Sequence, residues 1–131
     1  MASVFAHTVR IESADCGVAL GRLEPAARAD LIEAEAVLAL AHHCGDAALR
    51  GIAAAVGGAI RCAPAQSNIT HFRGATGALS AAALVDRELP CYVADDIRRD
   101  GNVRARVNVA LVDDDGEPVA LGVFEFEMAQ G

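Results

Sequence analysis

The chain has 131 residues, of which 53% are hydrophobic and 22% are charged. This length is typical of one domain, and this composition excludes an intrinsically disordered chain, so we predict a single domain spanning residues 1–131. The net charge of −7, with arginine as the only strongly basic residue type, argues against a nucleic-acid-binding protein, which needs a basic surface to contact phosphates.

The sequence predicts neither a membrane span nor a secretory signal. The most apolar segment, residues 47–60, is interrupted by Arg50 and by glycines, and it is shorter than the roughly 20 apolar residues that cross a bilayer. The first ten residues lack the basic start and apolar segment of a signal peptide. We therefore expect a cytoplasmic protein without a membrane partner.

The four cysteines form no Cys-x-x-Cys pair, which is the wrong arrangement for a zinc site or a small disulfide scaffold. We interpret all four as buried thiols: Cys16, Cys44, Cys62 and Cys91.

The N-terminal third predicts a hairpin followed by a long helix. Residues 5–11 alternate with the period of two that is typical of a strand, and residues 18–23 fit the returning strand. Residues 26–44 are strong helix formers, with Pro25 suited to the first turn and Gly45 to the end. Because apolar residues surround nearly the whole helix axis, we expect the rest of the protein to enclose this helix.

The middle of the chain predicts a second, shorter helix and another strand. Asp46 can cap a short helix that extends through Val56, where Gly57 and Gly58 end it. Residues 59–72 have an extended pattern, and we predict a strand there.

The C-terminal half predicts three strands and a short helix. Residues 78–85 are alanine-rich, which suits a helix, but the glycines before them suit a turn into a strand, and we prefer the strand. The other predicted elements are a helix from Asp86 to Asp100, a strand at 103–111 and a strand at 119–128, the last two joined by the glycine-containing loop 113–116. The result is an α+β fold with one antiparallel sheet.

Two stretches carry a resemblance to a known family: Ser67–Ala75, and Gly101–Val107 followed by Asp113–Ala120. Together with the element order, they resemble the hot-dog fold acyl-CoA thioesterase superfamily. The resemblance implies a curved antiparallel sheet wrapped around one long central helix. It also implies a homodimer, or a dimer of such dimers, with active sites at the subunit interface, an acyl-CoA or related acyl thioester as the substrate, and no cofactor.

Many thioesterases of this superfamily carry a His-Gly-Gly turn at the start of the long helix, followed by an acidic residue. The corresponding segment of this chain, residues 25–30, reads Pro-Ala-Ala-Arg-Ala-Asp. The resemblance therefore leaves two functions open, an acyl-CoA hydrolase and a non-catalytic acyl-CoA-binding or structural protein of the same fold.

Glu33 and Glu35 are the candidate catalytic groups, because a carboxylate on a mostly apolar helix is costly to desolvate unless it is paired, protonated or used in chemistry. On a helix they point about 200° apart, so at most one of them faces a given site. Glu35 shares a face with Leu38 and His42. In a thioesterase the carboxylate would act as a general base on water or as a nucleophile.

The candidate substrate-binding residues lie in and just after the strand predicted at residues 59–72. The resemblance places Ser67, Asn68, Thr70 and His71 along the partner's helix, and we select Asn68 and Thr70 as groups that orient water or polarise the thioester carbonyl. Arg73 is a candidate contact for the phosphates of coenzyme A.

The segment His42-His43-Cys44 does not predict a metal site, because neighbouring helical residues point about 100° apart and no second ligand set stands at the usual spacing.

Overall fold

The computed structural model describes residues 7–15, 17–25, 34–57, 60–74, 77–85 and 89–130. In chain order these residues form β1 (His7–Asp15), β2 (Val18–Pro25), α1 (Ala34–Val56), β3 (Ile60–His71), β4 (Leu79–Val85), α2 (Leu89–Asp100), β5 (Asn102–Val112) and β6 (Pro118–Gln130). Each predicted strand is present. Phe5, Ala6, Asp86 and the predicted start of the long helix, residues 26–33, lie outside the described residues.

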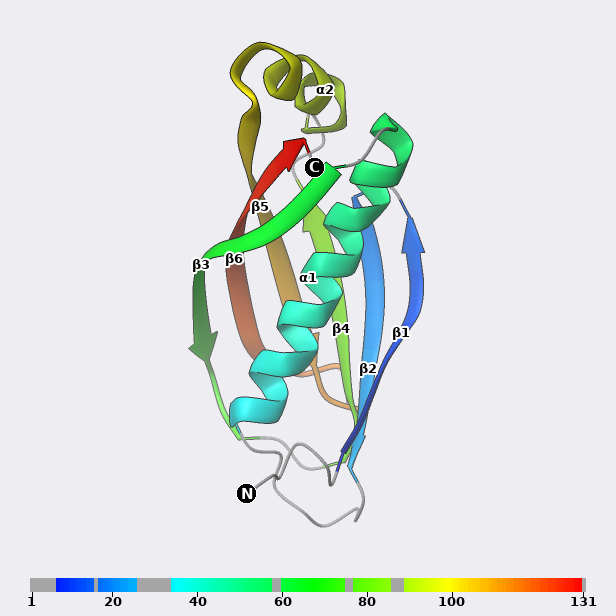
Figure 1. Cartoon of the computed structure of the whole chain (residues 1–131). Coiled ribbons are helices and arrows are strands. Elements are labelled where there is room, and N and C mark those ends of the chain that lie inside the picture. The colour runs from blue at the N-terminus through cyan, green and yellow to red at the C-terminus, as the bar shows by residue number, and fades with distance from the viewer. Residues whose placement is uncertain are drawn as a thin grey trace.

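The strands form one six-stranded antiparallel sheet in the order β1-β2-β4-β5-β6-β3. Figure 1 shows this sheet curving around α1, which lies across its concave face, while α2 lies beyond one end of the sheet. The predicted α+β arrangement, a curved antiparallel sheet around one long helix, is confirmed. Among the described residues, neither helix is long and apolar enough to cross a membrane.

The core lies between α1 and the concave face of the sheet. Alternation along β5 buries Ala105, Val107, Val109 and Leu111 and leaves the residues between them exposed. The largest fully buried side chains are Phe124 and Phe126 of β6. Because the rest of the described core is built from alanine, other aliphatic side chains, Cys44 and Met128, helix and sheet approach each other closely.

The two helices predicted on either side of Gly45 are a single helix, so the predicted end at Gly45 is wrong. Gly45 is buried within α1, and a Cβ atom there would lie 3.1 Å from Cγ1 of Val107 and 3.6 Å from Cγ2 of Val109. The glycine is therefore a packing residue, and it lets the helix backbone approach β5. The helix ends at Val56, where Gly57 adopts a φ of +87° and donates its amide to the carbonyl of Ala53.

The prediction that the rest of the protein encloses the helix on most sides is only partly met within the single chain. One face of α1 is buried against the sheet, whereas Glu35, Leu38, His43 and Arg50 are exposed on the other side. The sheet covers only one face, because it is a single layer.

The thiol prediction holds for Cys44 and partly for Cys62. Cys44 is fully buried on α1, its Sγ lies 3.2 Å from the carbonyl oxygen of Ala19, and burial raises its pKa to about 11. Cys62 is half-buried rather than buried. The side chains of Cys16 and Cys91 lie outside the described residues.

β3 is an edge strand with an irregularity in its middle. It pairs with β6 on one side only, and its register shifts between Pro64 and Gln66, so Ala65 has no partner across the pair. A proline is tolerated here because an edge strand leaves one row of amides unpaired. The bulge bends the strand, and Figure 1 shows β3 curving past α1.

The loop between β5 and β6 is fixed by Asp113. Its Oδ1 accepts hydrogen bonds from the backbone amides of Asp115 at 2.9 Å and Glu117 at 3.0 Å, and its carboxylate also pairs with Arg73, which follows β3. The amide of Glu117, then that of Asp115 and the charge of Arg73, lower the pKa of Asp113. Arg73 therefore ties the end of β3 to this loop.

Replacing Gly45 with valine should destabilise the protein by about 1–3 kcal/mol, because the added methyl groups meet Val107 and Val109 in a close-packed interface. Urea denaturation measures the free energy of unfolding. Ala55→Val, on an exposed position of the same helix, is the control and should change this free energy by less than about 0.5 kcal/mol. Equal stability of the two variants would show that Gly45 does not set the spacing between helix and sheet.

Replacing Asp113 with asparagine should lower the thermal midpoint at pH 7 but not in strong acid. The pKa of Asp113 is lowered in the folded protein, so its charged form contributes stability above the ordinary Asp pKa of about 3.9, and that stability is lost as the pH falls through the folded pKa. Melting curves at pH 7 and pH 2 test this, with Asp115→Asn as the control. A difference between wild type and Asp113→Asn that stays constant across this range would contradict the assignment.

Candidate active site

Two neighbouring depressions lie where α1 faces β3 and β6. The first, which we call the α1 depression, has a volume of about 300 Å³ and is lined by Glu35, Leu38, Ala39, His42, His43, Ser67 and Phe124. The second, the β3 depression, has a volume of about 260 Å³ and is lined by Pro64, Ala65, Gln66, Glu125 and Phe126, together with His42, Ser67 and Phe124. His42, Ser67 and Phe124 are common to both, so the two depressions meet at these three residues.

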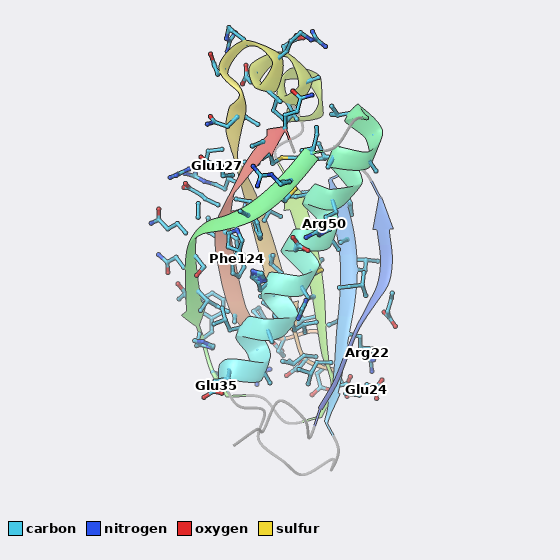
Figure 2. The ribbon with its side chains drawn as sticks, in the orientation of Figure 1. Arg22, Glu24, Glu35, Arg50, Phe124 and Glu127 are labelled. Carbon is cyan, nitrogen blue, oxygen red and sulfur yellow. The ribbon has the colours of Figure 1, made fainter. Side chains whose placement is uncertain are left out.

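Regular spacing along α1 brings one row of side chains to this place. Glu35, Leu38 and His42 are three and four residues apart, which puts them on the same face of a helix. On the sheet side, Ser67 of β3 and Phe124 of β6 are directly paired across the two strands. Figure 2 shows Glu35 at the first turn of α1 and Phe124 beside the middle of the helix.

His42 is half-buried at the junction of the depressions. Its ring lies edge-on to Phe124, with centroids 6.2 Å apart, and tilted against Phe126 at 5.6 Å. Burial, followed by the neighbouring charge of His43, lowers the pKa of His42, while Asp46 acts in the opposite direction. The imidazole is therefore mainly neutral at pH 7.

Glu35 lines the α1 depression, but its side chain is exposed. The sequence predicted a chemical role for this carboxylate because its desolvation would be costly. In the structure Glu35 is exposed, so this reason does not apply to it. Glu33 lies outside the described residues.

The selected polar residues of β3 do not line either depression. Ser67 faces the helix side of the sheet, and Ile69, two residues on, packs against the core. Alternation along a strand places Asn68 and Thr70 on the opposite face, and both are exposed. The structure therefore brings Ser67 together with Glu35, but not Asn68 or Thr70.

Arg73 lies after the end of β3, where it pairs with Asp113 and donates from Nε to the carbonyl of Pro118 at 3.3 Å. Its guanidinium is half-exposed, with 46% of the side chain accessible, so one side of it remains open to solvent. It is not among the residues that line the two depressions.

Sequence reasoning missed two features of this site. From the sequence His42 has no assigned role, because the helix is predicted to end at Gly45, close to this residue. The seven-residue spacing from Glu35 to His42 was the available signal. The sequence did not indicate that Phe124 and Phe126 line this site, because alternating phenylalanines on a strand are typical of any core.

Within the described ranges, no group of three or more His, Cys, Asp or Glu side chains is placed to hold a metal ion. The rings of His42 and His43 are perpendicular, with centroids 6.0 Å apart. Neighbouring positions on the helix thus point these two rings in different directions.

No family model matches the sequence, and no curated protein sequence matches it. Solved structures do resemble it. PA5026 of Pseudomonas aeruginosa, a probable thioesterase of unknown function, has a TM-score of 0.79 at 19% identity, with 94% of this chain and 83% of that chain covered.

Two further structures give similar agreement. A hypothetical thioesterase from Streptococcus pneumoniae with coenzyme A has a TM-score of 0.69 at 10% identity, covering 95% of this chain and 89% of that one. The PaaI protein of the Escherichia coli phenylacetic acid degradation operon has a TM-score of 0.66 at 16% identity, covering 90% and 81%. A six-stranded antiparallel sheet curved around one long helix, shared with these proteins, shows that the chain has the hot-dog fold.

Proposed function

We propose that this protein is an acyl-CoA thioesterase that hydrolyses its substrate in the two depressions beside α1. The observation that carries the proposal is the meeting of these depressions at His42, Ser67 and Phe124, with the carboxylate of Glu35 lining one of them. An acyl thioester is elongated, with an acyl group on one side of the reacting carbonyl and the pantetheine arm on the other. Two connected depressions fit that shape.

The walls of the α1 depression suit an acyl chain. Leu38, Ala39 and Phe124 supply apolar surface, and the polar groups Glu35, His42 and Ser67 stand beside it. An apolar lining with a few polar groups is typical of small-molecule sites. The neighbour that binds coenzyme A has the same fold, which supports an acyl-CoA as the ligand.

Glu35 is the proposed general base, and Glu33 remains a candidate from the sequence alone. In this reaction Glu35 accepts a proton from water as the water oxygen bonds to the thioester carbon. The tetrahedral intermediate then breaks its carbon–sulfur bond, and the leaving thiolate takes up the proton that Glu35 received. The products are a carboxylic acid and free coenzyme A.

A homodimer, or a dimer of such dimers, is part of this proposal. The free edge of β3 extends over the 12 residues of the strand, and residues 63–68 are all exposed in the single chain. Long unpaired edges are normally protected by charge or by pairing, and β3 carries only Arg61 and His71 as ionisable basic groups. Pairing of two β3 edges would bring a second copy against the β3 depression.

We also propose that Asn68, Thr70 and Arg73 contact the substrate from such a partner or from the outer rim of the site, since none of them lines the depressions of its own chain. A cytoplasmic location is proposed as well. Cys44 and Cys62 are free thiols in the described structure, which suits a reducing compartment.

A second candidate function is acyl-CoA binding without hydrolysis. The exposure of Glu35 favours it, because a solvated carboxylate is a weaker base in catalysis than a desolvated one.

The purified protein should release free thiol from at least one member of a panel of short, medium and aromatic acyl-CoAs. Glu35→Gln should lower kcat by about 100-fold, since it removes the proton acceptor. The matched control is Glu127→Gln, an exposed carboxylate on β6 outside both depressions. Saturable coenzyme A binding without turnover on any substrate would favour the second candidate. Equal turnover by Glu35→Gln and wild type would remove Glu35 from the mechanism.

Sedimentation equilibrium should give at least twice the chain mass of 13.5 kDa, because the β3 edge is expected to pair with a second copy. The sedimentation experiment is done at the protein concentration used in the activity assay. An active species that sediments as a single chain would contradict an interfacial site.

A further inference from the structure

His42 is placed to touch the reacting group of any ligand that fills both depressions. It is one of only three residues among the described ones that line both, and it is the only ionisable one of the three. Phe124 has no hydrogen-bonding group, and Ser67 approaches from the sheet side. An elongated ligand that passes from one depression into the other therefore passes the imidazole.

The ring of His42 is held in position but keeps its hydrogen-bonding capacity. Phe124 and Phe126 contact it from β6, and His43 contacts it from the same helix. Within the described part of the chain, no hydrogen bond engages its ring nitrogens, although the residue is half-buried. The accessible side of the ring lies in the two depressions, so its nitrogens are free to bond a ligand that fills them.

Burial against Phe124 and Phe126 favours the neutral imidazole of His42 over the imidazolium, although carboxylates also stand near the ring. Glu35, His43 and Asp46 share α1 with it, and Glu125 borders the β3 depression, where its carboxylate pairs with Arg104 and Arg106 on β5. The segment of β3 that lines the site, residues 64–67, has no ionisable side chain. A neutral imidazole carries one N–H donor and one acceptor nitrogen.

We propose that His42 is a catalytic hydrogen-bond donor to the carbonyl oxygen of the bound thioester. This inference rests on the proposed thioesterase function. Glu35 and His42 are seven residues apart, about 10 Å along the helix axis, so the attacking water and the carbonyl group lie between them. The two side chains therefore act on different atoms.

His42 keeps its proton throughout this step and acts only as a hydrogen-bond donor. As the water oxygen bonds to the carbonyl carbon, the electron pair of the C=O double bond moves to oxygen, and the imidazole N–H stabilises the resulting oxyanion. The intermediate re-forms the double bond and breaks the carbon–sulfur bond, and the thiolate leaves with that electron pair. An imidazolium could transfer a proton to the oxyanion, whereas a neutral imidazole stabilises the oxyanion by a hydrogen bond alone. Other enzymes use a neutral histidine in this way.

Two substitutions separate a donor from a base. His42→Leu removes the donor and should lower kcat by about 10²- to 10³-fold, whereas KM should rise by no more than about tenfold, because one ground-state hydrogen bond is lost. His42→Gln keeps an N–H donor and should retain kcat within about tenfold of wild type. Ala55→Gln, at an exposed position of the same helix outside both depressions, is the control and should behave as wild type. Equal losses in the Leu and Gln variants, together with loss of an acidic limb in the pH profile, would overturn the donor role in favour of a base.

A binding measurement tests His42 independently of turnover. In one acyl-CoA analogue a CH₂ group replaces the sulfur and the carbonyl remains, and in a second analogue the carbonyl is also reduced to CH₂. His42→Leu should raise the Kd of the first by about five- to tenfold, as expected for one hydrogen bond, and should leave the second unchanged. Unchanged Kd values for both analogues would overturn the proposal even if wild type hydrolyses acyl-CoA.

If wild type binds these analogues but hydrolyses no substrate, the proposed function fails while the contact to His42 is still tested. The carbonyl stretching frequency of the ketone analogue bound to wild type and to His42→Gln gives a second measurement that needs no leucine variant. A shift to lower frequency on binding to both is expected. A bound carbonyl without a shift would contradict a donor at this position.

Discussion

The packing of α1 against the concave face of the sheet is the interaction on which the structure depends. Leu40, Ala41, Cys44, Ala48, Leu49 and Ile52 are fully buried along this contact. Burial of apolar surface of this kind is the main favourable contribution to folding. Gly45 in the middle of the row allows the close approach, since any side chain there would meet Val107. The sheet curves around the helix, and this contact fixes the place of every residue of the candidate site.

The site forms where this packing ends. Along its buried face α1 contacts the central strands, and at the side of β3 the cover is incomplete, because β3 is an edge strand with a bulge at Ala65. Bulges commonly reorient side chains next to binding sites. Here the bulge lies in the segment that lines the β3 depression. The irregular segment of β3 therefore lies beside His42, which lines the same depression.

The candidate site was predictable only in part. Helical spacing places Glu35, Leu38 and His42 on one face, and all three line the α1 depression. The sequence did not indicate that Glu35 is exposed at the first turn while His42 is half-buried two turns later. Depth depends on which strand lies above each residue, and periodicity carries no such information. The family resemblance places Ser67 and Asn68 together beside a helix as polar groups of one strand. Alternation along β3 instead points Ser67 toward the helix and Asn68 away from it.

By itself, the sequence determined the elements whose signals are local. Alternation defined β5 and β6, the turn residues at 113–116 defined their connection, and Gly57 marked the end of the helix, because period, turn chemistry and backbone freedom act over a few residues. Only the tertiary structure decided that α1 continues through Gly45. Helix propensity disfavours glycine in a helix interior by about 1 kcal/mol relative to alanine. Tertiary packing favours it at position 45, because a side chain there would meet Val107 and Val109. The tertiary structure likewise decided that His42 meets Phe124, since residues 82 positions apart come together only when β6 takes its place beside β3 in the sheet.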